Sequence, residues 1–327
     1  MRADPLLQLA NKTDPTWIFR LGHLFSEQVE RWSQIQKSPE YPELCGLARE
    51  VAPMCQGLSP EVVRRDTEQI LMSDGAPAGL QWLEDSGGLA AFLPELHATV
   101  DFSQEAGRRH KDVWEHTKQV VVQAAPRPAV RWAALLHDIG KVRTRSFTPD
   151  GKVTFHRHSE VGAKMFEDIG RRLRFDREAH RTLRFLILHH LRPNQYVTSW
   201  TDSAVRRFEK EVGPHLGDLL DLSRADITSR RPGKRQQALV NIDALAGRID
   251  QIKAEDAVLP LLPSGIGDVI MERFRLPPSR LIGDLKRALE AQVESGELEP
   301  RMDPSYYLQH VEKLLEEAPK GPCVCQE

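Results

Sequence analysis

The residues with the clearest chemical potential are histidines and aspartates that lie in apolar helical stretches. His137 and Asp138 end the run RWAALLHDIGK, and Gly140 and Lys141 follow at once. Burying an imidazole beside a carboxylate is costly unless a partner satisfies their polar atoms. Either another side chain or a metal ion must therefore pair with these two residues.

Further candidates with the same character lie on both sides of this pair. His116 lies in DVWEHTKQVV and Asp226 in LLDLSRADITS, whereas His158 and His190 lie in FHRHSEVGAKMF and RFLILHHLRP. Imidazole and carboxylate ligands suit borderline and hard divalent ions, and ligands on separate helices can converge in a bundle. We therefore expect a site for one or two divalent ions, with Mg, Mn, Ni and Co as candidates.

Each candidate has a plainer interpretation when it is taken alone. A single histidine on an apolar face is most often a hydrogen-bonded core residue, and a single aspartate such as Asp226 most often caps or covers a helix. The order H…HD…D, with every member in an apolar helix, favours the metal site instead. Adjacent His and Asp side chains point about 100° apart on a helix. They reach one ion only near a helix end, which Gly140 fits, or they serve two ions.

Helices must hold these residues in place. A 3.6-residue apolar period predicts a helix over 17–33, and Ser59 and Pro60 begin another. Between 112 and 192 the pattern is helix, helix, hairpin, helix, helix, with Pro149-Asp150-Gly151 as the turn of the hairpin. Further helices are expected over 203–229, 236–255 and 266–298. The fold class predicted is all-α.

Composition limits the class of protein. The 327 residues are 40% hydrophobic and 28% charged, with a net charge of −2, as in a soluble globular protein without strong bulk attraction to nucleic acid. No run has membrane-spanning length, and residues 1–30 carry no signal-peptide pattern, so no membrane partner and a cytoplasmic location are expected. Four cysteines are too few for a disulfide framework, and Cys323-x-Cys325 is interpreted as part of a disordered end.

Several motifs together carry a family resemblance. EHT at 115–117, ALLHDIGK at 134–141 and ADITS at 225–229 resemble the HD superfamily of metal-dependent phosphohydrolases. Residues 58–316 more broadly resemble the neck, HD domain and C-terminal region of bacterial tRNA nucleotidyltransferases, the CCA-adding and poly(A) polymerase family. The Gly-Gly motif and paired aspartates of the family's nucleotidyltransferase head have no match here, so CCA addition is not expected.

The resemblance implies an architecture. It predicts an HD-domain helical bundle with a small β-hairpin insertion, flanked by helical neck and tail regions. The expected boundaries are 1–100 for an N-terminal helical region that is neck-like from about 58, 101–256 for the HD domain, 257–318 for a helical tail region and 319–327 for a disordered tail.

The resemblance also assigns roles to the residues named above. The core metal ligands are matched by four residues: His116, His137, Asp138 and Asp226. His158 and His190 match the extra ligands of two-metal members, but Ser159 replaces an acidic residue of the family, which leaves the second ion open. Asp138 would bridge two ions or orient a water. Lys141, and more weakly Arg143, Arg145 and Arg192, would bind substrate phosphate, although a lysine at a helix end is often only solvated.

The implied activity is hydrolysis of phosphomonoesters or phosphodiesters. 2′,3′-Cyclic nucleotides, 2′-nucleotides and RNA ends are the expected substrates, and the basic loop 229–236 could contact RNA backbone. The main alternative is a non-catalytic accessory protein that binds tRNA or other RNA through the neck and tail helices. Hydrolysis of a signalling nucleotide is a third interpretation. The sequence does not reveal the oligomeric state.

Overall fold

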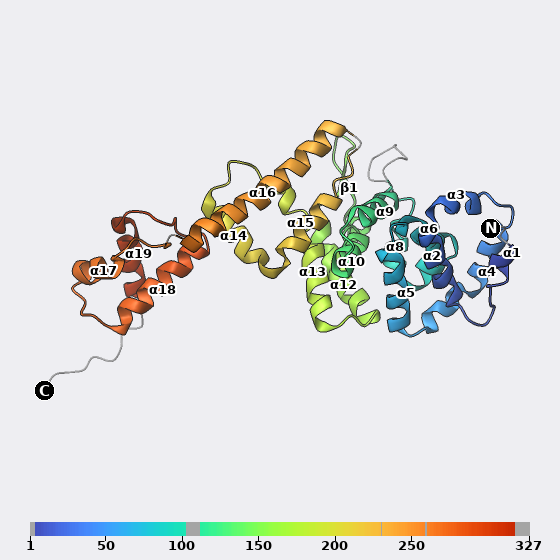
Figure 1. Ribbon diagram of the computed structural model, residues 1–327, viewed down its shortest axis with the longest axis horizontal. Coiled ribbons are helices and arrows are strands. Elements are labelled where there is room, and N and C mark those ends of the chain that lie inside the picture. Colours follow the sequence, from blue (N-terminus) through green and yellow to red (C-terminus); the bar gives the residue numbers. More distant parts are fainter. Residues whose placement is uncertain (1–3, 103–111, 230, 259, 318–327) are drawn as a thin grey trace. The chain divides into compact units, whose positions relative to one another are not determined.

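The computed structural model describes residues 4–102, 112–229, 231–258 and 260–317. The regular structure in these residues is helical apart from one antiparallel hairpin, in which β1 (Ser146–Phe147) pairs with β2 (Val153–Thr154) (Figure 1). The predicted all-α class and the small hairpin around Gly151 are therefore confirmed. The expected disordered tail and its Cys323-x-Cys325 motif lie outside the described residues.

The chain divides into two compact units. The first comprises Met1–Gln195 with Gly217–Ile242, and the second comprises Tyr196–Leu216 with Asp243–Glu327. The long helix α16 (Pro232–Val258) contributes residues to both. The domain boundaries expected from the family resemblance stay a prediction.

The first unit begins with short helices packed around an aromatic core. Its elements are α1 (Asp4–Leu7), α2 (Trp17–Glu27), α3 (Val29–Gln36), α4 (Tyr41–Val51), η1 (Ala52–Gly57), α5 (Pro60–Met72), α6 (Ala76–Asp85), α7 (Gly88–Phe92) and α8 (Pro94–His97). The Trp82 ring packs against Trp17, Phe25 and Tyr41, and its indole N–H donates to the Ile18 carbonyl at 2.7 Å. Burial of these large rings is the main stabilising contribution to this part of the fold.

The helix predicted over 17–33 is wrong in one respect, because the structure divides it into α2 and α3 at Gln28. The backbone there has φ −117° and ψ 49°, outside the helical region. The Ser26 carbonyl, two residues before this break, accepts a hydrogen bond from the Ser73 hydroxyl at 2.8 Å, which ties the end of α2 to a residue 47 positions away.

The rest of the first unit carries the candidate site. Its elements are α9 (Val113–Gln123), α10 (Pro128–Leu136), α11 (Lys141–Thr144), the hairpin, α12 (His158–Arg172), α13 (Arg177–His189), η2 (Pro193–Gln195) and α15 (Leu216–Ala225), of which α15 begins one residue before the boundary. Helix α10 is buried along most of its length, and Trp132, Leu135 and Leu136 lie in the core. A helix apolar on so many sides is typical of the centre of a bundle.

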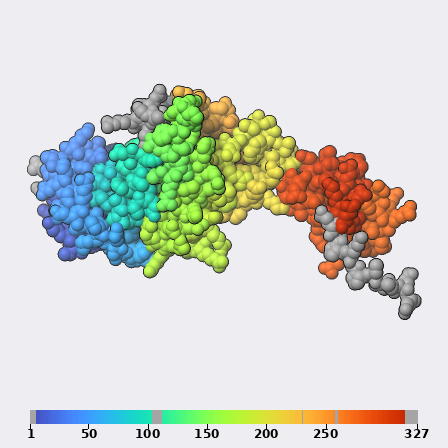
Figure 2. All heavy atoms as spheres, turned by 180° about the vertical axis from the view of Figure 1, so that it is seen from behind, coloured from blue at the N-terminus to red at the C-terminus, as the bar shows by residue number. Residues whose placement is uncertain are grey.

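Buried hydrogen bonds join the N-terminal helices to this part of the first unit. The Arg131 guanidinium, only 3% exposed, donates to the carbonyls of Leu71 and Ala124 at 2.8 Å each. Arg172 at the end of α12 forms two hydrogen bonds to the Glu95 carboxylate, at 2.9 and 2.6 Å. In Figure 2 the blue and teal surface of the N-terminal helices continues without a break into the green surface of α12 and α13.

The second unit has a small apolar core of its own. It contains α14 (Asp202–Val212), η3 (Gly213–His215), the end of α16, α17 (Ile266–Phe274), α18 (Arg280–Glu294) and α19 (Pro304–Glu317). Ile270, Leu289 and Tyr307 are fully buried in its core. The helices predicted over 203–229 and 266–298 are each interrupted, at Gly213-Pro214 and Pro277-Pro278, where proline removes the backbone N–H that a continuous helix requires.

None of the described helices combines the length and the apolar character that crossing a membrane requires.

Candidate metal centre

Helices α9 and α15 bring the first pair of candidate ligands together. Asp112 caps α9 by accepting a hydrogen bond from the Trp114 amide at 2.6 Å, which places His116 in the first turns of the helix. Asp226 directly follows the last residue of α15. The His116 Nε2 atom lies 3.0 Å from Asp226 Oδ1, although the two residues are 110 positions apart in the sequence.

His137 and Asp138 complete the first cluster from the end of α10. His137 Nε2 lies 3.2 Å from Asp138 Oδ2, 3.4 Å from Asp226 Oδ1 and 3.2 Å from His116 Nε2. His137 is fully buried and Asp138 is 2% exposed. As expected for adjacent ligands, they meet where the helix ends, because α10 stops at Leu136 and the next four residues form a turn.

A second cluster shares Asp138 with the first. Its Oδ1 atom lies 3.4 Å from His158 Nε2, and His158 Nε2 lies 3.4 Å from His190 Nε2. Ligand atoms of His116, His137 and Asp138 all lie within 4.8 Å of one another, and so do those of Asp138, His158 and His190. The carboxylate of Asp138 thus presents one oxygen to each cluster, as a bridge between two ions would.

Three of the four histidines are oriented in the same way. The Nδ1 atoms of His137, His158 and His190 each contact the carbonyl oxygen three residues earlier, at 2.8, 2.9 and 2.8 Å. Because a carbonyl only accepts, Nδ1 carries the proton, and Nε2 turns toward the cluster. Hydrogen bonds of this kind fix the tautomer and orientation of metal-binding histidines.

The fourth histidine uses a side-chain partner that the sequence pattern did not reveal. His116 Nδ1 lies 2.9 Å from the Thr228 hydroxyl. Thr228 stands two residues after Asp226 in the motif ADITS. This closeness to a candidate ligand was the only feature of the sequence that pointed to a role for Thr228 in the site. Thr228 holds the His116 ring with its Nε2 atom toward Asp226.

Electrostatics divide the histidines into two pairs. Burial lowers the pKa of His137, but the carboxylates of Asp138 and Asp226 outweigh it and raise the pKa to about 10. The same two carboxylates raise the pKa of His116 against its burial. Burial lowers the pKa of His158, and it lowers that of His190 to about 4.

The aspartates respond in the opposite sense. Although burial alone would raise them, the pKa values of Asp138 and Asp226 are held well below their usual range by the surrounding imidazoles and, for Asp138, by Lys141. Both are carboxylates at neutral pH. In this structure the imidazoles of His116 and His137 share protons with the carboxylates of Asp138 and Asp226. A divalent cation bound by the same atoms would displace these protons. The donor set therefore fits a divalent ion.

The expected substrate-binding residues differ in their placement. The Lys141 ammonium lies 2.6 Å from Asp138 Oδ2 and its side chain is only 12% exposed, so it is not the freely solvated lysine of the alternative interpretation. Arg143, on the same short helix, is exposed. Arg192 is half-buried in the turn after α13, where its amide donates to the His189 carbonyl at 2.9 Å.

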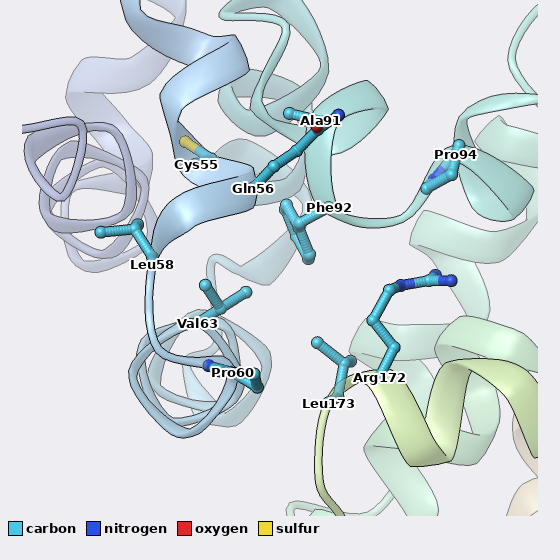
Figure 3. A pocket seen from close by; sticks show the side chains of 10 residues that line it. All are labelled: Cys55, Gln56, Leu58, Pro60, Val63, Ala91, Phe92, Pro94, Arg172 and Leu173. Atoms are coloured by element: carbon cyan, nitrogen blue, oxygen red, sulfur yellow. The ribbon is translucent and has the colours of Figure 1, made fainter.

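A pocket of about 320 Å³ lies elsewhere in the first unit. Its lining combines η1, α5 and α7 with the end of α12, which contributes Arg172 and Leu173 (Figure 3). The other lining residues are mostly apolar, and burial raises the pKa of the Cys55 thiol to about 11, so that the thiol is unreactive at neutral pH. None of the candidate metal ligands lines this pocket.

Comparison with known proteins places these residues in a family. Residues 113–231, which include all six candidate ligands, match the HD domain. The chain is 34% identical over 244 residues to the CC-adding tRNA nucleotidyltransferase of Thermus thermophilus, across 72% of this chain and 53% of that protein. It is 31% identical over 252 residues to the A-adding tRNA nucleotidyltransferase of Deinococcus radiodurans, across 73% of this chain and 55% of that protein.

A third relative matches a shorter part. The multifunctional CCA protein of Pseudomonas fluorescens is 33% identical over 144 residues, 42% of this chain and 34% of that protein. The chain spans about half the length of the two tRNA nucleotidyltransferases. These matches confirm the resemblance drawn from the sequence motifs: this chain is an HD-domain protein, homologous to tRNA nucleotidyltransferases over about 70% of its length.

Proposed function

We propose that this chain is a metal-dependent phosphohydrolase acting on phosphomonoesters or phosphodiesters. Its substrates would be 2′,3′-cyclic nucleotides, 2′-nucleotides or RNA ends, and it would act in the cytoplasm. The observation that carries the proposal is the convergence of two carboxylates and four imidazole Nε2 atoms around Asp138. The match to the HD domain, a family of metal-dependent hydrolases, supports it.

The proposed ligands fall into two sets that share Asp138. His116, His137 and Asp226 would hold one ion with it, and His158 and His190 would hold a second. When bound, a divalent ion lowers the pKa of a water toward neutrality and offsets charge on a phosphoryl oxygen. Ser159 stands where the family has an acid, and its hydroxyl donates to Glu160 Oε2 at 3.0 Å, so the second set is proposed without a ligand from this position.

Other groups of the chain would position the substrate. Lys141 carries a positive charge beside Asp138, and its ammonium can donate to a phosphate oxygen at the mouth of the cluster. Arg143 and Arg192 are proposed as weaker contacts to the same phosphate. The Nδ1 atoms of His137 and His190 each donate a hydrogen bond to a backbone carbonyl. These hydrogen bonds would keep the Nε2 ligand atoms in place while substrate binds.

The experiment is a panel of phosphoesters assayed with Mg²⁺, Mn²⁺, Co²⁺ and Ni²⁺. We expect turnover of a 2′,3′-cyclic nucleotide or a simple model phosphoester only with a divalent ion. Asp138→Ala should lower the rate roughly a thousandfold or more, because it removes the residue shared by both proposed ion sites. A folded Asp138→Ala protein that retains the wild-type rate would show that the signal comes from elsewhere.

A second candidate function is favoured by the comparisons. The relatives matched are named tRNA nucleotidyltransferases, so a non-catalytic protein that binds tRNA is the alternative, with tRNA as its partner. This alternative predicts tRNA binding without turnover of any ester in the panel. Neither function includes addition of CMP or AMP to a tRNA 3′ end, because residues 1–100 contain no match to the paired aspartates of a nucleotidyltransferase head. Extension of tRNA by the purified 327-residue chain with CTP or ATP would contradict both.

A further inference from the structure

A row of aromatic and basic side chains leads from the candidate metal centre to the exposed hairpin. Lys141, which contacts Asp138, lies over the Phe155 ring at 5.6 Å from the ring centroid. Phe155 packs against Phe102 with ring centroids 6.3 Å apart. The row continues through residues that have no role in the metal centre.

Arg145 joins the inner part of this row to its outer end. Its guanidinium lies 5.0 Å from the centroid of the Phe102 ring and 5.1 Å from that of the Phe147 ring. The guanidinium therefore places a positive charge beside both rings, a combination that attracts an anionic ligand carrying an aromatic base. No ion pair joins Arg145 to another residue in the part of the chain that the structure describes.

Phe147 at the outer end is the least buried phenylalanine of the row. It lies on β1, and 60% of its surface is exposed, the largest value among the exposed large apolar residues of the described chain. Keeping a phenylalanine ring in water forgoes a burial gain of roughly 1.5–3 kcal/mol. The hairpin does not require it, since β1 and β2 are joined by backbone pairing and by the Ser146–Thr154 hydroxyl contact at 2.8 Å.

We propose that Phe147 and Arg145 form a stacking surface for a nucleobase of a single-stranded oligonucleotide whose phosphoester reaches the metal centre. This inference rests on the proposed function and names its substrate class. Aromatic rings interleaved with basic side chains bind single strands, because every base has a face that stacks and every phosphate is anionic. Positive charge beside the ring distinguishes this ligand from an apolar protein segment, which a guanidinium would not attract.

The row also defines which base is stacked. Lys141, Phe155 and Phe102 stand between Asp138 and the pair Arg145–Phe147. In the proposed arrangement the stacked base belongs to a neighbouring nucleotide, not to the one whose phosphate lies at Asp138. A mononucleotide is too short to use the surface, and an oligonucleotide gains from it.

The test measures binding in EDTA, where no turnover occurs, by fluorescence anisotropy of a labelled hexanucleotide. Phe147→Ala should weaken binding roughly five- to hundredfold, the loss of one base–aromatic stack. Arg145→Ala should also weaken it, whereas Leu9→Ala, which removes another exposed apolar side chain of the first unit, should not. The matched ligand is the same hexanucleotide made abasic at every position, whose affinity should be equal for the wild type and Phe147→Ala.

Equal affinity of the wild type and Phe147→Ala for the base-bearing strand would overturn the stacking surface. An equal loss for the base-bearing and the abasic strand would overturn it as well, because the effect would then not depend on a base. The proposed function is judged separately, by metal-dependent turnover of a base-free phosphoester such as glycerol 2-phosphate or a simple alkyl diester. Base-dependent binding without any such turnover would support the stacking surface and would contradict the proposed phosphohydrolase function.

Discussion

Asp138 is the residue on which the candidate centre depends. Its two carboxylate oxygens face different histidine pairs, and its Oδ2 atom also contacts the Lys141 ammonium at 2.6 Å. A carboxylate that is 2% exposed and surrounded by cationic groups stays ionised, and a buried charge so placed is tolerated only because it is fully paired. This pairing explains why His137 and Asp138 are tolerated at the end of an apolar helix.

At this scale the sequence indicated which residues to consider but not how they are held. The order H…HD…D selected His116, His137, Asp138 and Asp226, and the structure brings their side chains within 3.4 Å contacts of one another. The contact of Thr228 with His116 could not be predicted, because it joins residues 112 positions apart. The contact of Lys141 with Asp138, by contrast, joins residues three positions apart in the turn after α10, a spacing that the sequence shows directly.

Lys141→Ala is expected to lower turnover about tenfold to a hundredfold and to leave metal affinity unchanged or tighter. The variant removes a charge that contacts phosphate, and it also removes a cation that competes with a metal for Asp138 Oδ2. Rate constants and metal titrations on the same preparation check both halves of this expectation. Lys164→Ala, which changes an exposed lysine of α12 that has no proposed role in the site, is the control and should change the rate less than threefold. Loss of metal binding in Lys141→Ala would contradict this role.

A different carboxyl group should make stability depend on pH. Burial, followed by the neighbouring Asp85, raises the pKa of Glu84 to about 7. The folded protein therefore holds a proton that the unfolded chain releases above its ordinary value of 4.5. By linkage, this group's contribution is fully present below about pH 4.5 and is lost as the pH rises to about 7.

Glu84→Gln should therefore stabilise the protein at pH 8. The gain should be on the order of 1 kcal/mol, because Glu84 is only half-buried and screening by water reduces the free energy that the pKa shift would otherwise imply. At pH 4.5 the variant and the wild type should be similar. Chemical denaturation at the two pH values measures the difference. Glu43→Gln, at an exposed position, should show no such change between them. A destabilised Glu84→Gln at pH 8 would mean that the carboxylate is needed in its charged form.

At the scale of elements, apolar periods located the helices, and tertiary contacts decided where they end. The hairpin follows from Pro149-Asp150-Gly151, where Gly151 takes φ +78°. The interruptions at Gly213-Pro214 and Pro277-Pro278 were readable from the sequence in principle, because proline ends a helix for local reasons. The division between α2 and α3 at Gln28 has no such local proline, and the end of α2 contacts Ser73, 47 residues from Ser26.

The turn between α10 and α11 also depends on a contact that the sequence does not show. Gly140 has an ordinary helical φ of −67°, so its backbone conformation does not require glycine. Its requirement is steric, since a Cβ atom there would lie 2.0 Å from the His158 carbonyl oxygen and 2.6 Å from the Gly162 amide nitrogen. The sequence interpretation of Gly140 as a helix end was compatible with the structure but missed this close approach.

Gly140→Ala is expected to push the turn formed by residues 137–140 away from α12. The close contact should destabilise the protein by about 1–3 kcal/mol or more. Because the displaced segment begins with His158, metal affinity should fall as well. Thermal or chemical unfolding and a metal titration report the two effects. Gly46→Ala is the matched control, since a Cβ there meets nothing within 4 Å, and alanine at a helical position should stabilise by up to about 1 kcal/mol. Equal stability of the two variants would contradict the close packing.

In the whole molecule, the candidate centre joins segments of the first unit that lie up to 110 residues apart in the sequence. Its side chains come from α9, from the turns after α10, α13 and α15, and from the start of α12. An ion bound there would connect all five segments and would be absent from the unfolded chain. Binding to the folded state alone raises stability with the logarithm of the free ion concentration, so the metal is expected to stabilise the first unit as a whole.

The central claim is that the side chains gathered around Asp138 bind divalent metal ions. Its most direct measurement is a calorimetric titration of the metal-free protein with Mn²⁺ or Ni²⁺ at pH 6 and pH 8. We expect saturable binding that releases protons and is tighter at pH 8, because His137 has a pKa of about 10 without metal and must lose its proton to bind. Asp226→Asn should weaken this binding at least about a hundredfold. Absence of saturable binding to the wild type, or equal binding by a folded Asp226→Asn protein, would contradict the account.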